Sequence, residues 1–313
     1  MVRFIRSWLE LFRIPNWLTV PAEPLAGLFL ALAHSPNSDP AWLPVILAAL
    51  CLYAGGIGWN DYFDRGRDLL RRPERPIPSG RVRSWPVLWT SNLLMAAGLI
   101  LCGLISTLTL WIGLILVICI YCYDRHLKRV PLIGSLTMGC CRGLSLLLGA
   151  SVILEASQIP AIVWLAAAVV TLYVAAITQA AKGEALPRNP GLEVWGPFVA
   201  LLFSLIFYVP LVAVWSLAVI GLLAVVVLLP LAAALRLYAL RTTRNLPRTL
   251  AAKAIAPKVL PRWIGWLIAN LLWLSAFFIW SAGLPDEIAL PALASLGGCW
   301  LGNRLLSLLF YSS

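Results

Sequence analysis

Charged side chains are scarce in this chain: only 12% of its 313 residues are Asp, Glu, Lys or Arg, whereas 61% are hydrophobic. Together with a mean hydropathy of +0.89, this balance excludes an ordinary soluble domain. Acidic residues are the scarcer sign, and the formal net charge is +11. The basic residues gather in short loops between apolar runs, as the positive-inside rule expects, so the charge does not indicate a nucleic-acid partner. The sequence therefore predicts a polytopic membrane protein.

The sequence also lacks the patterns of a thiol metal centre and of a cleavable signal peptide. All seven cysteines lie in apolar segments, and the CxxC of Cys119 and Cys122 has no second ligand pair, so a metal or redox role is not indicated. His126 has no acidic partner at an obvious spacing and is interpreted as a loop residue. Charges interrupt the apolar run near the N-terminus, which favours an amphipathic segment on the membrane surface; they are Arg3, Arg6, Glu10 and Arg13.

A transmembrane helix needs about 20 predominantly apolar residues, and this rule divides the chain into ten expected spans. They cover residues 17–34, 41–62, 85–107, 109–124, 131–153, 160–181, 195–211, 213–238, 263–282 and 288–309. The pair around Pro210 could instead be one kinked helix, but only two spans keep the basic loops alternating with basic-poor ones. The basic stretches 63–84, 125–129, 182–188 and 241–262 then share the cytoplasmic side with the N-terminus.

The most informative stretch is NDYFDRGRDLLRRPERPIPSGRVR, from Asn60 to Arg83. If the preceding helix continues, Asn60, Asp64 and Asp68 recur every four residues. Asp61 lies three residues before Asp64, so four oxygen-bearing side chains share nearly one helix face. Hard oxygen ligands suit Mg²⁺. Arginines follow whose forks match phosphate, although some could only anchor the loop; the set is Arg65, Arg67, Arg71, Arg72, Arg75, Arg81 and Arg83.

The run NDYFDRGRD followed by RPERPIPSGRV resembles the first aspartate-rich motif, NDxxDxxxD, of the UbiA superfamily of membrane prenyltransferases. The resemblance implies an all-α membrane bundle of nine to ten helices that binds a polyprenyl diphosphate through Mg²⁺ and transfers the prenyl chain to an acceptor. It implies a catalytic role for Asp61, Asp64 and Asp68. The residues assigned to the metal are Asn60, Asp61, Asp64 and Asp68, and those assigned to the diphosphate are Arg71, Arg72, Arg75 and Lys128.

A second motif, DxxxD, follows the sixth span in most members of that superfamily. Here the region reads TLYVAAITQAAKGEALPRNPG and contains no aspartate. Glu184 alone could hold one Mg²⁺, Lys182 could replace a second metal as a point charge on the diphosphate, or the region could be a plain cytoplasmic loop. With the LKR, MGCCRG and LLLG runs, this departure resembles the EboC-like branch of the superfamily.

Arg142 in MGCCRG lies within an expected span, where a guanidinium costs about 2.5 to 3.5 kcal/mol at the centre on insertion scales. Two interpretations remain open. It forms a structural ion or carbonyl pair, or it faces an anionic substrate from a cavity.

We therefore expect residues 1–313 to form one integral membrane domain: a Mg²⁺-dependent prenyltransferase of a bacterial inner membrane. Its N-terminus, its loop 63–84 and its active site would be cytoplasmic, and its acceptor is unidentified. The alternative is a non-catalytic binding or transport protein for a prenyl or lipid-linked compound, which the missing second motif favours. A scaffold subunit is disfavoured, because a scaffold has no need for aligned carboxylates.

Overall fold

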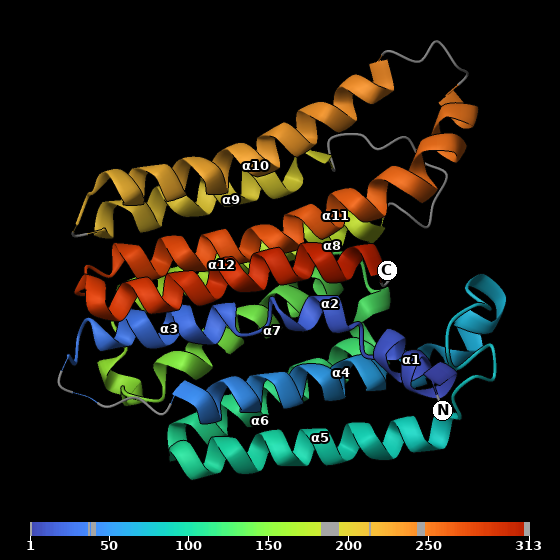
Figure 1. Cartoon of the computed structure of the whole chain (residues 1–313), viewed down its shortest axis with the longest axis horizontal. Helices are drawn as coiled ribbons and strands as arrows, with labels where there is room; N and C mark the ends of the chain where they lie inside the picture. The colour runs from blue at the N-terminus through green and yellow to red at the C-terminus, as the bar shows by residue number, and fades with distance from the viewer. Residues whose placement is uncertain are drawn as a thin grey trace.

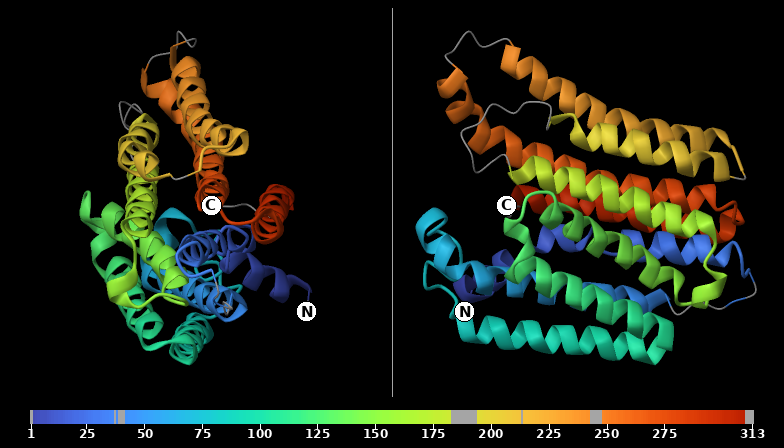
Figure 2. Two further views of the ribbon diagram at one scale, coloured as in Figure 1. Left: turned by 90° about the vertical axis from the view of Figure 1, so that its left-hand side faces the viewer. Right: turned by 180° about the vertical axis from the view of Figure 1, so that it is seen from behind.

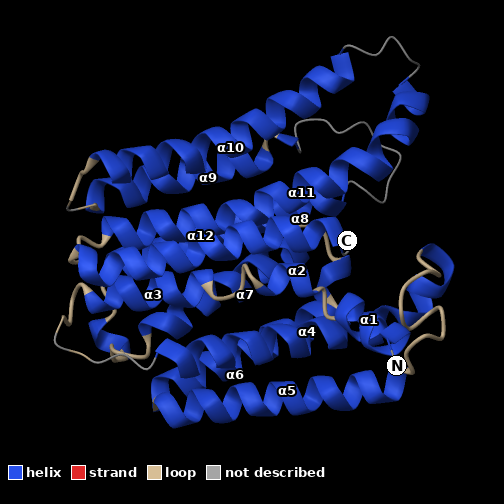
Figure 3. Ribbon diagram, viewed as in Figure 1, coloured by secondary structure: helices blue, strands red, loops and turns tan. Residues whose placement is uncertain are grey.

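The computed structural model describes residues 2–36, 38, 42–182, 194–212, 214–242 and 248–309, and within them it contains helices and no strand (Figure 3). Most of the helices run side by side in one bundle (Figure 1). They are α1 (Val2–Leu11), α2 (Ile14–Trp17), α3 (Ala22–Leu32), α4 (Trp42–Arg71), α5 (Ser84–Ile105), α6 (Thr107–Arg125), α7 (Ile133–Ala150), α8 (Ala161–Lys182), α9 (Gly196–Tyr208), α10 (Leu217–Thr242), α11 (Arg248–Ser281) and α12 (Asp286–Leu309), with the short 3-10 helices η1 (Leu127–Arg129), η2 (Ala156–Gln158) and η5 (Val209–Leu211). The all-α prediction is confirmed.

Each of the ten expected spans overlaps a helix, and the prediction of a membrane protein is confirmed. Among the described residues, seven helices are long and apolar enough to cross a bilayer. These are α4, α5, α6, α7, α8, the part of α10 from Leu217 to Arg236 and the part of α11 from Trp263 to Ser281. Ten full spans are therefore not confirmed. The expected break near Pro210 is present, because α9 ends at Tyr208 and α10 begins at Leu217.

The first expected span, residues 17–34, is not one helix. It is interrupted at residues 18–21, between α2 and α3, and Pro21 is the N-cap residue of α3. Proline lacks the backbone N–H that would continue a helix and is favoured where one begins. Apart from Phe29, every residue of α3 is buried, so α3 lies inside the bundle rather than on its lipid-facing surface.

Close packing places α7 between α3 and α8. A Cβ on Gly149 would collide with the carbonyl of Pro24 in α3, and one on Gly139 would collide with the carbonyl of Thr171 in α8. Small residues allow such backbone approach between membrane helices. Because both sides of α7 are fixed in this way, the position of Arg142 on it is fixed as well.

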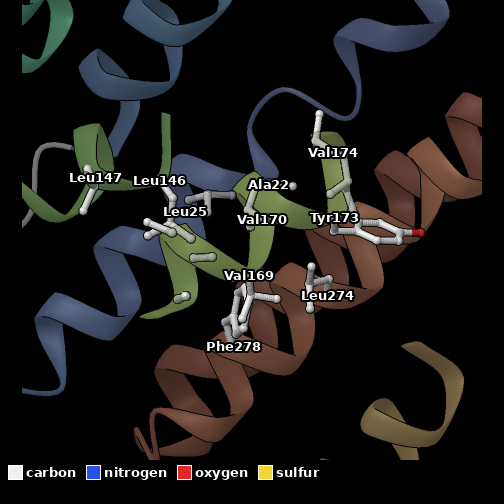
Figure 4. Packing of buried hydrophobic residues seen from close by; sticks show 14 of the residues in the cluster. Ala22, Leu25, Leu146, Leu147, Val169, Val170, Tyr173, Val174, Leu274 and Phe278 are labelled. Atoms are coloured by element: carbon white, nitrogen blue, oxygen red, sulfur yellow. The ribbon is translucent and has the colours of Figure 1, made fainter. Parts of the chain in front are cut away.

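Buried side chains of α3, α7, α8 and α11 meet in the core shown in Figure 4, where Leu25, Leu146, Val170 and Phe278 come from these four helices in turn. A hydrogen bond between two helices lies in this core: the hydroxyl of Tyr173 in α8 donates to the carbonyl oxygen of Leu267 in α11 at 3.1 Å. Buried polar groups in membrane proteins are satisfied by such bonds between helices.

The described helix ends that flank the four basic stretches lie at one end of the bundle, together with α1 (Figures 1 and 2). They are the end of α4 and start of α5, the end of α6 and start of α7, the end of α8, and the end of α10 and start of α11. This arrangement agrees with the predicted alternation of the loops. That this end faces the cytoplasm stays a prediction.

Candidate active site

Helix α4 continues beyond its apolar segment to Arg71, so the condition for the shared polar face is met. Residues 63–71, which were expected in a loop, are helical, and the connection to α5 is limited to residues 72–83. Asp61 and Asp68 are buried, since each residue is only 6% exposed. The end of α4 therefore presents buried carboxylates at the end of the bundle where the basic stretches lie.

Arginines from two other segments neutralise the first and last of these carboxylates. Arg75, in the connection after α4, donates from Nη1 to Asp68 Oδ2 at 2.7 Å and lies 3.7 Å from Asp61 Oδ1. Arg13 Nη2 donates to Asp61 Oδ1 at 3.2 Å. Burial alone would lower the pKa of Arg13, but Asp61 and the other nearby carboxylates raise it above its usual value. Arg13 is therefore a permanent cation at this site.

Arg13 was not predicted as a site residue, and its backbone explains how it reaches the site. It lies between α1 and α2 with φ 50° and ψ 54°, a left-handed conformation that is uncommon outside glycine. Helix α1 is tied to the connection after α4 by Arg81, which donates to Glu10 at 2.6 Å. Such conformations persist only where the surrounding structure holds them. The sequence signal was weak: Arg13 is the last charge before the first apolar stretch.

Lys128 in η1 neutralises the middle carboxylate. Its Nζ lies 2.8 Å from Asp64 Oδ2 and donates to Asn60 Oδ1 at 3.1 Å. The other carboxylate oxygen, Asp64 Oδ1, is buried, and no hydrogen bond from the described part of the chain reaches it. Asn60, Asp64 and Lys128, all predicted site residues, are thus brought together, and Asp64 retains an unsatisfied buried oxygen.

A fourth carboxylate, Asp124, lies near this group and was missed in the sequence. It is 3% exposed in the last turn of α6, and it lies within electrostatic range of Lys128, Asp64 and Arg13. The signal that could have found it is its place in YCYDRHLKR, four residues before Lys128 at the same membrane edge.

Four other predicted site residues form no hydrogen bond or ion pair with the aspartates in the described part of the chain: Arg71, Arg72 and Lys182, predicted for the diphosphate, and Glu184, predicted for the metal. Arg71 and Arg72 are exposed and form no ion pair within the described ranges. Lys182, the last residue of α8, lies with Nζ 3.5 Å from the carbonyl oxygen of Val130, which follows η1. Glu184 lies outside the described residues. The roles assigned to these four residues stay predictions.

Arg142 lies deeper in the bundle and contacts none of the α4 aspartates within hydrogen-bond distance in the described structure. Its Nη1 donates to Glu23 Oε2 at 3.0 Å and its Nη2 donates to Thr19 Oγ1 at 3.2 Å. Its guanidinium also lies 5.6 Å from the ring centroid of Tyr53. These contacts match the ion-pair interpretation of Arg142. A role in binding substrate stays a prediction.

The residue types on α4 fit Mg²⁺, which binds carboxylate oxygens and keeps part of its coordination for water and substrate. The unsatisfied Asp64 Oδ1 is an oxygen of this kind. Within the described ranges, no three His, Cys, Asp or Glu side chains are already close enough to hold a metal ion. Each α4 aspartate is instead paired with a cation, Asp61 with Arg13, Asp68 with Arg75 and Asp64 with Lys128, so these cations would share the carboxylates with a metal.

Fold and site together define a class: a polytopic helical membrane protein with a cluster of aspartates and fixed cations at one end of its bundle. The sequence profile of the UbiA prenyltransferase family matches residues 24–259, and the chain belongs to that family. The resemblance found in NDYFDRGRD and RPERPIPSGRV is thereby confirmed at the level of the family.

Several curated proteins share part of this sequence. Digeranylgeranylglyceryl phosphate synthase of Methanosarcina barkeri is 35% identical over an alignment 159 positions long, which covers 47% of this chain and 55% of the relative. The synthase of Thermococcus gammatolerans is 34% identical over 146 residues, 47% of this chain and 52% of the relative. The chain thus spans about half the length of the curated relatives it matches.

Solved structures share the fold. A digeranylgeranylglyceryl phosphate synthase has a TM-score of 0.57 at 22% identity, with 91% of this chain and 100% of the other covered. A UbiA homologue from Aeropyrum pernix has a TM-score of 0.57 at 18% identity, with 79% and 96% covered. A UbiA homologue from Archaeoglobus fulgidus, bound to GPP and Mg²⁺, has a TM-score of 0.52 at 17% identity, with 85% and 99% covered. At these identities the likeness concerns the fold alone.

Proposed function

We propose that the protein is a Mg²⁺-dependent intramembrane prenyltransferase, which transfers the prenyl group of a polyprenyl diphosphate to an acceptor. The observation that carries this proposal is the α4 face, where Asp61, Asp64 and Asp68 follow one another and each pairs with a cation from another segment. A structural ion-pair network needs every oxygen satisfied, whereas Asp64 Oδ1 is left without a partner in the described structure.

Two of the comparisons support the donor and the metal. The curated relatives are named for a product that carries geranylgeranyl groups, and a homologue with the same fold binds GPP together with Mg²⁺. A diphosphate and a divalent cation have the chemistry that the aspartates and arginines of α4 and its following connection would recognise. The acceptor of this chain is not specified by either comparison.

In the proposed reaction the bond between C1 of the prenyl chain and the diphosphate oxygen breaks, and its electron pair leaves with the diphosphate. A bond then forms between C1 and a nucleophilic atom of the acceptor, and the proton that this atom loses passes to the released diphosphate or to water. Mg²⁺, when bound, would neutralise charge that develops on the leaving diphosphate. Asp61, Asp64 and Asp68 would hold the metal, and Arg75 and Lys128 would donate hydrogen bonds to diphosphate oxygens. Cations fixed before the reaction need no reorganisation as charge develops.

Breaking the C1–oxygen bond before the new bond forms leaves an allylic carbocation on the prenyl chain, and the membrane interior of the bundle would protect this cation from water. The core between α3, α7, α8 and α11 is apolar and closely packed, and excluding water prevents hydrolysis of such an intermediate. Aromatic faces stabilise cations. The ring of Tyr53, on the same helix as the aspartates, already faces one cation, Arg142.

The direct test uses purified protein in lipid nanodiscs with labelled prenyl diphosphates of several chain lengths and a panel of acceptors. Mg²⁺-dependent transfer of label, abolished by EDTA and restored by Mg²⁺, is the expected result. Tight binding without transfer to any acceptor would instead favour the binding or transport protein. That alternative draws support from the cation already paired with each α4 aspartate and from the absence of aspartate in TLYVAAITQAAKGEALPRNPG.

A pair of variants tests how the altered second motif works. If Glu184 serves as a metal ligand, Glu184→Gln is expected to weaken Mg²⁺ and diphosphate binding together, because it removes a charged ligand and keeps the shape. If Lys182 supplies a point charge, Lys182→Ala should weaken diphosphate binding about tenfold and leave metal affinity unchanged. Arg129→Ala, which removes an exposed cation of η1, is the matched control. Titration calorimetry with Mg²⁺ and with a prenyl diphosphate measures both; normal binding by both variants would mark this region as a plain loop.

A further inference from the structure

Helix α12 lies against the short helix α2 (Figure 1). The side-chain amide of Asn303, in α12, donates from Nδ2 to the carbonyl oxygen of Pro15, in α2, at 2.7 Å. Both residues are buried, and 288 positions of the chain separate them. Hydrogen bonds of this kind tie helices together inside a membrane bundle. Both residues also lie outside the range 24–259 that matches the family profile, so the family match assigns them no role.

The carbonyl of Pro15 needs a partner because α2 is only one turn long. In a longer α-helix the backbone N–H of Thr19 would donate to this carbonyl, which lies four residues earlier. Here α2 ends at Trp17, and the N–H of Thr19 donates to the carbonyl of Asn16 at 3.0 Å instead. The amide of Asn303 therefore takes the place of that N–H.

Pro15 lies two residues after Arg13, the arginine that reaches the α4 aspartates. Arg13 has a φ of 50°, which is unfavourable for a residue other than glycine. A residue keeps such a conformation where the surrounding structure holds it. Before Arg13, the carbonyl of Phe12 accepts a hydrogen bond from Trp17 Nε1 at 2.8 Å, and after it Asn303 holds Pro15. The turn is thus fixed on both sides of Arg13.

The part of α12 that carries Asn303 is itself fixed to the bundle. The guanidinium of the next residue, Arg304, lies 3.5 Å from the ring centroid of Trp266 in α11. Cation and aromatic face attract each other in this arrangement, and α11 packs in turn against α3. Asn303 therefore holds the turn before α2 from a rigid support.

Arg13 has hydrogen-bond donors left for a ligand. Its Nη2 donates to Asp61 Oδ1 at 3.2 Å, whereas a guanidinium carries several N–H donors in a planar fork. The Arg13 side chain is 24% exposed, compared with 7% for the side chain of Asp61. Diphosphate oxygens placed beside Asp61 would therefore meet a guanidinium that is partly open to them, and Arg–phosphate hydrogen bonds are strong.

We propose that Asn303 is a positioning residue of the diphosphate site: through Pro15 it holds Arg13 against Asp61, where Arg13 donates hydrogen bonds to the diphosphate of the prenyl donor. The role of Arg13 toward the diphosphate rests on the proposed prenyl transfer, whereas the coupling of Asn303 to Arg13 does not. Helix α12 thereby supports a site whose carboxylates lie on α4.

The first experiment measures this coupling without any ligand. Asn303→Leu, Arg13→Gln and the double variant are unfolded with denaturant in one detergent. If Asn303 holds Arg13 in place, the two substitutions remove some of the same contacts, so the double variant should lose less unfolding free energy than the sum of the single losses. Additive losses would overturn the proposal, whether or not the protein is a transferase. Asn303→Ala, which removes the amide without adding a larger apolar side chain, gives the same cycle if Asn303→Leu does not fold.

The second experiment measures the affinity for a prenyl diphosphate with Mg²⁺. Arg13→Gln should weaken it at least about tenfold, the scale of a hydrogen bond between charged groups, and Asn303→Leu should reproduce most of this loss. The double variant should match Arg13→Gln within about twofold. Asn270→Leu is the matched control, because Asn270 is a buried amide that donates to the carbonyl of Val226 in another helix at 3.1 Å. This control should keep the wild-type affinity.

Wild-type affinity in Asn303→Leu would overturn the role of Asn303 at the site. An equal loss in Asn270→Leu would overturn it too, because the effect would then follow from weaker packing anywhere in the bundle. The same holds for a double variant that loses the sum of the two single effects. Donor binding that follows the expected cycle without transfer to any acceptor would refute the prenyltransferase and leave the role of Asn303 supported.

Discussion

Asp64→Asn is expected to abolish Mg²⁺-dependent binding of a prenyl diphosphate and to lower the rate of transfer at least about a hundredfold, the scale on which one electrostatic contact to developing charge acts. The substitution keeps the shape of the side chain and removes the charge that Lys128 neutralises and that a metal would bind. Lys128 retains Asn60 as an acceptor at 3.1 Å, so the variant should still fold and insert. The effect is therefore expected on ligand binding rather than on stability.

The measurement compares Mg²⁺ and diphosphate affinities of the wild type, Asp64→Asn and Glu287→Gln. Glu287 is an exposed carboxylate in the first turn of α12, at the other end of the bundle, and its replacement should change neither affinity. Equal loss in both variants would mean that net charge, rather than a site, governs binding. Metal-dependent binding retained by Asp64→Asn would remove Asp64 from the metal site.

The polar face of α4 could be predicted because its geometry is local. Helical spacing alone relates Asn60, Asp64 and Asp68, and the only structural condition was that the helix continue, which it does as far as Arg71. Lys128 could be predicted through the family resemblance of its LKR run. The break in the first expected span could have been predicted too, since Pro21 stands inside it.

The remaining site residues depend on contacts between distant segments, which a single sequence does not show. Arg13 reaches Asp61, 48 positions later, only because the chain turns through a left-handed residue before α2. Glu23 and Arg142 are 119 positions apart and meet because glycines let α3 and α7 approach. The charge pattern placed Arg13 on the membrane surface and left Arg142 with two interpretations. Neither periodicity nor composition could name their partners.

The strongest expected effect on stability comes from the pair of Glu23 and Arg142. Arg142→Leu alone should destabilise the folded protein by about 3–5 kcal/mol, because it leaves a fully buried carboxylate without its cation in a low-dielectric interior. Combining Arg142→Leu with Glu23→Leu should restore most of this loss, since replacing both partners of a buried ion pair by apolar side chains is often neutral or stabilising.

Denaturant or thermal unfolding of both variants in the same detergent measures this difference. A recovery in the double variant requires that the two charges interact directly, as the 3.0 Å contact indicates. If Arg142→Leu is as stable as the wild type, Arg142 faces a hydrated cavity in the membrane, and the interpretation of Arg142 as a ligand for an anionic substrate regains support. If the double variant is less stable than Arg142→Leu, Glu23 has a stabilising partner other than Arg142.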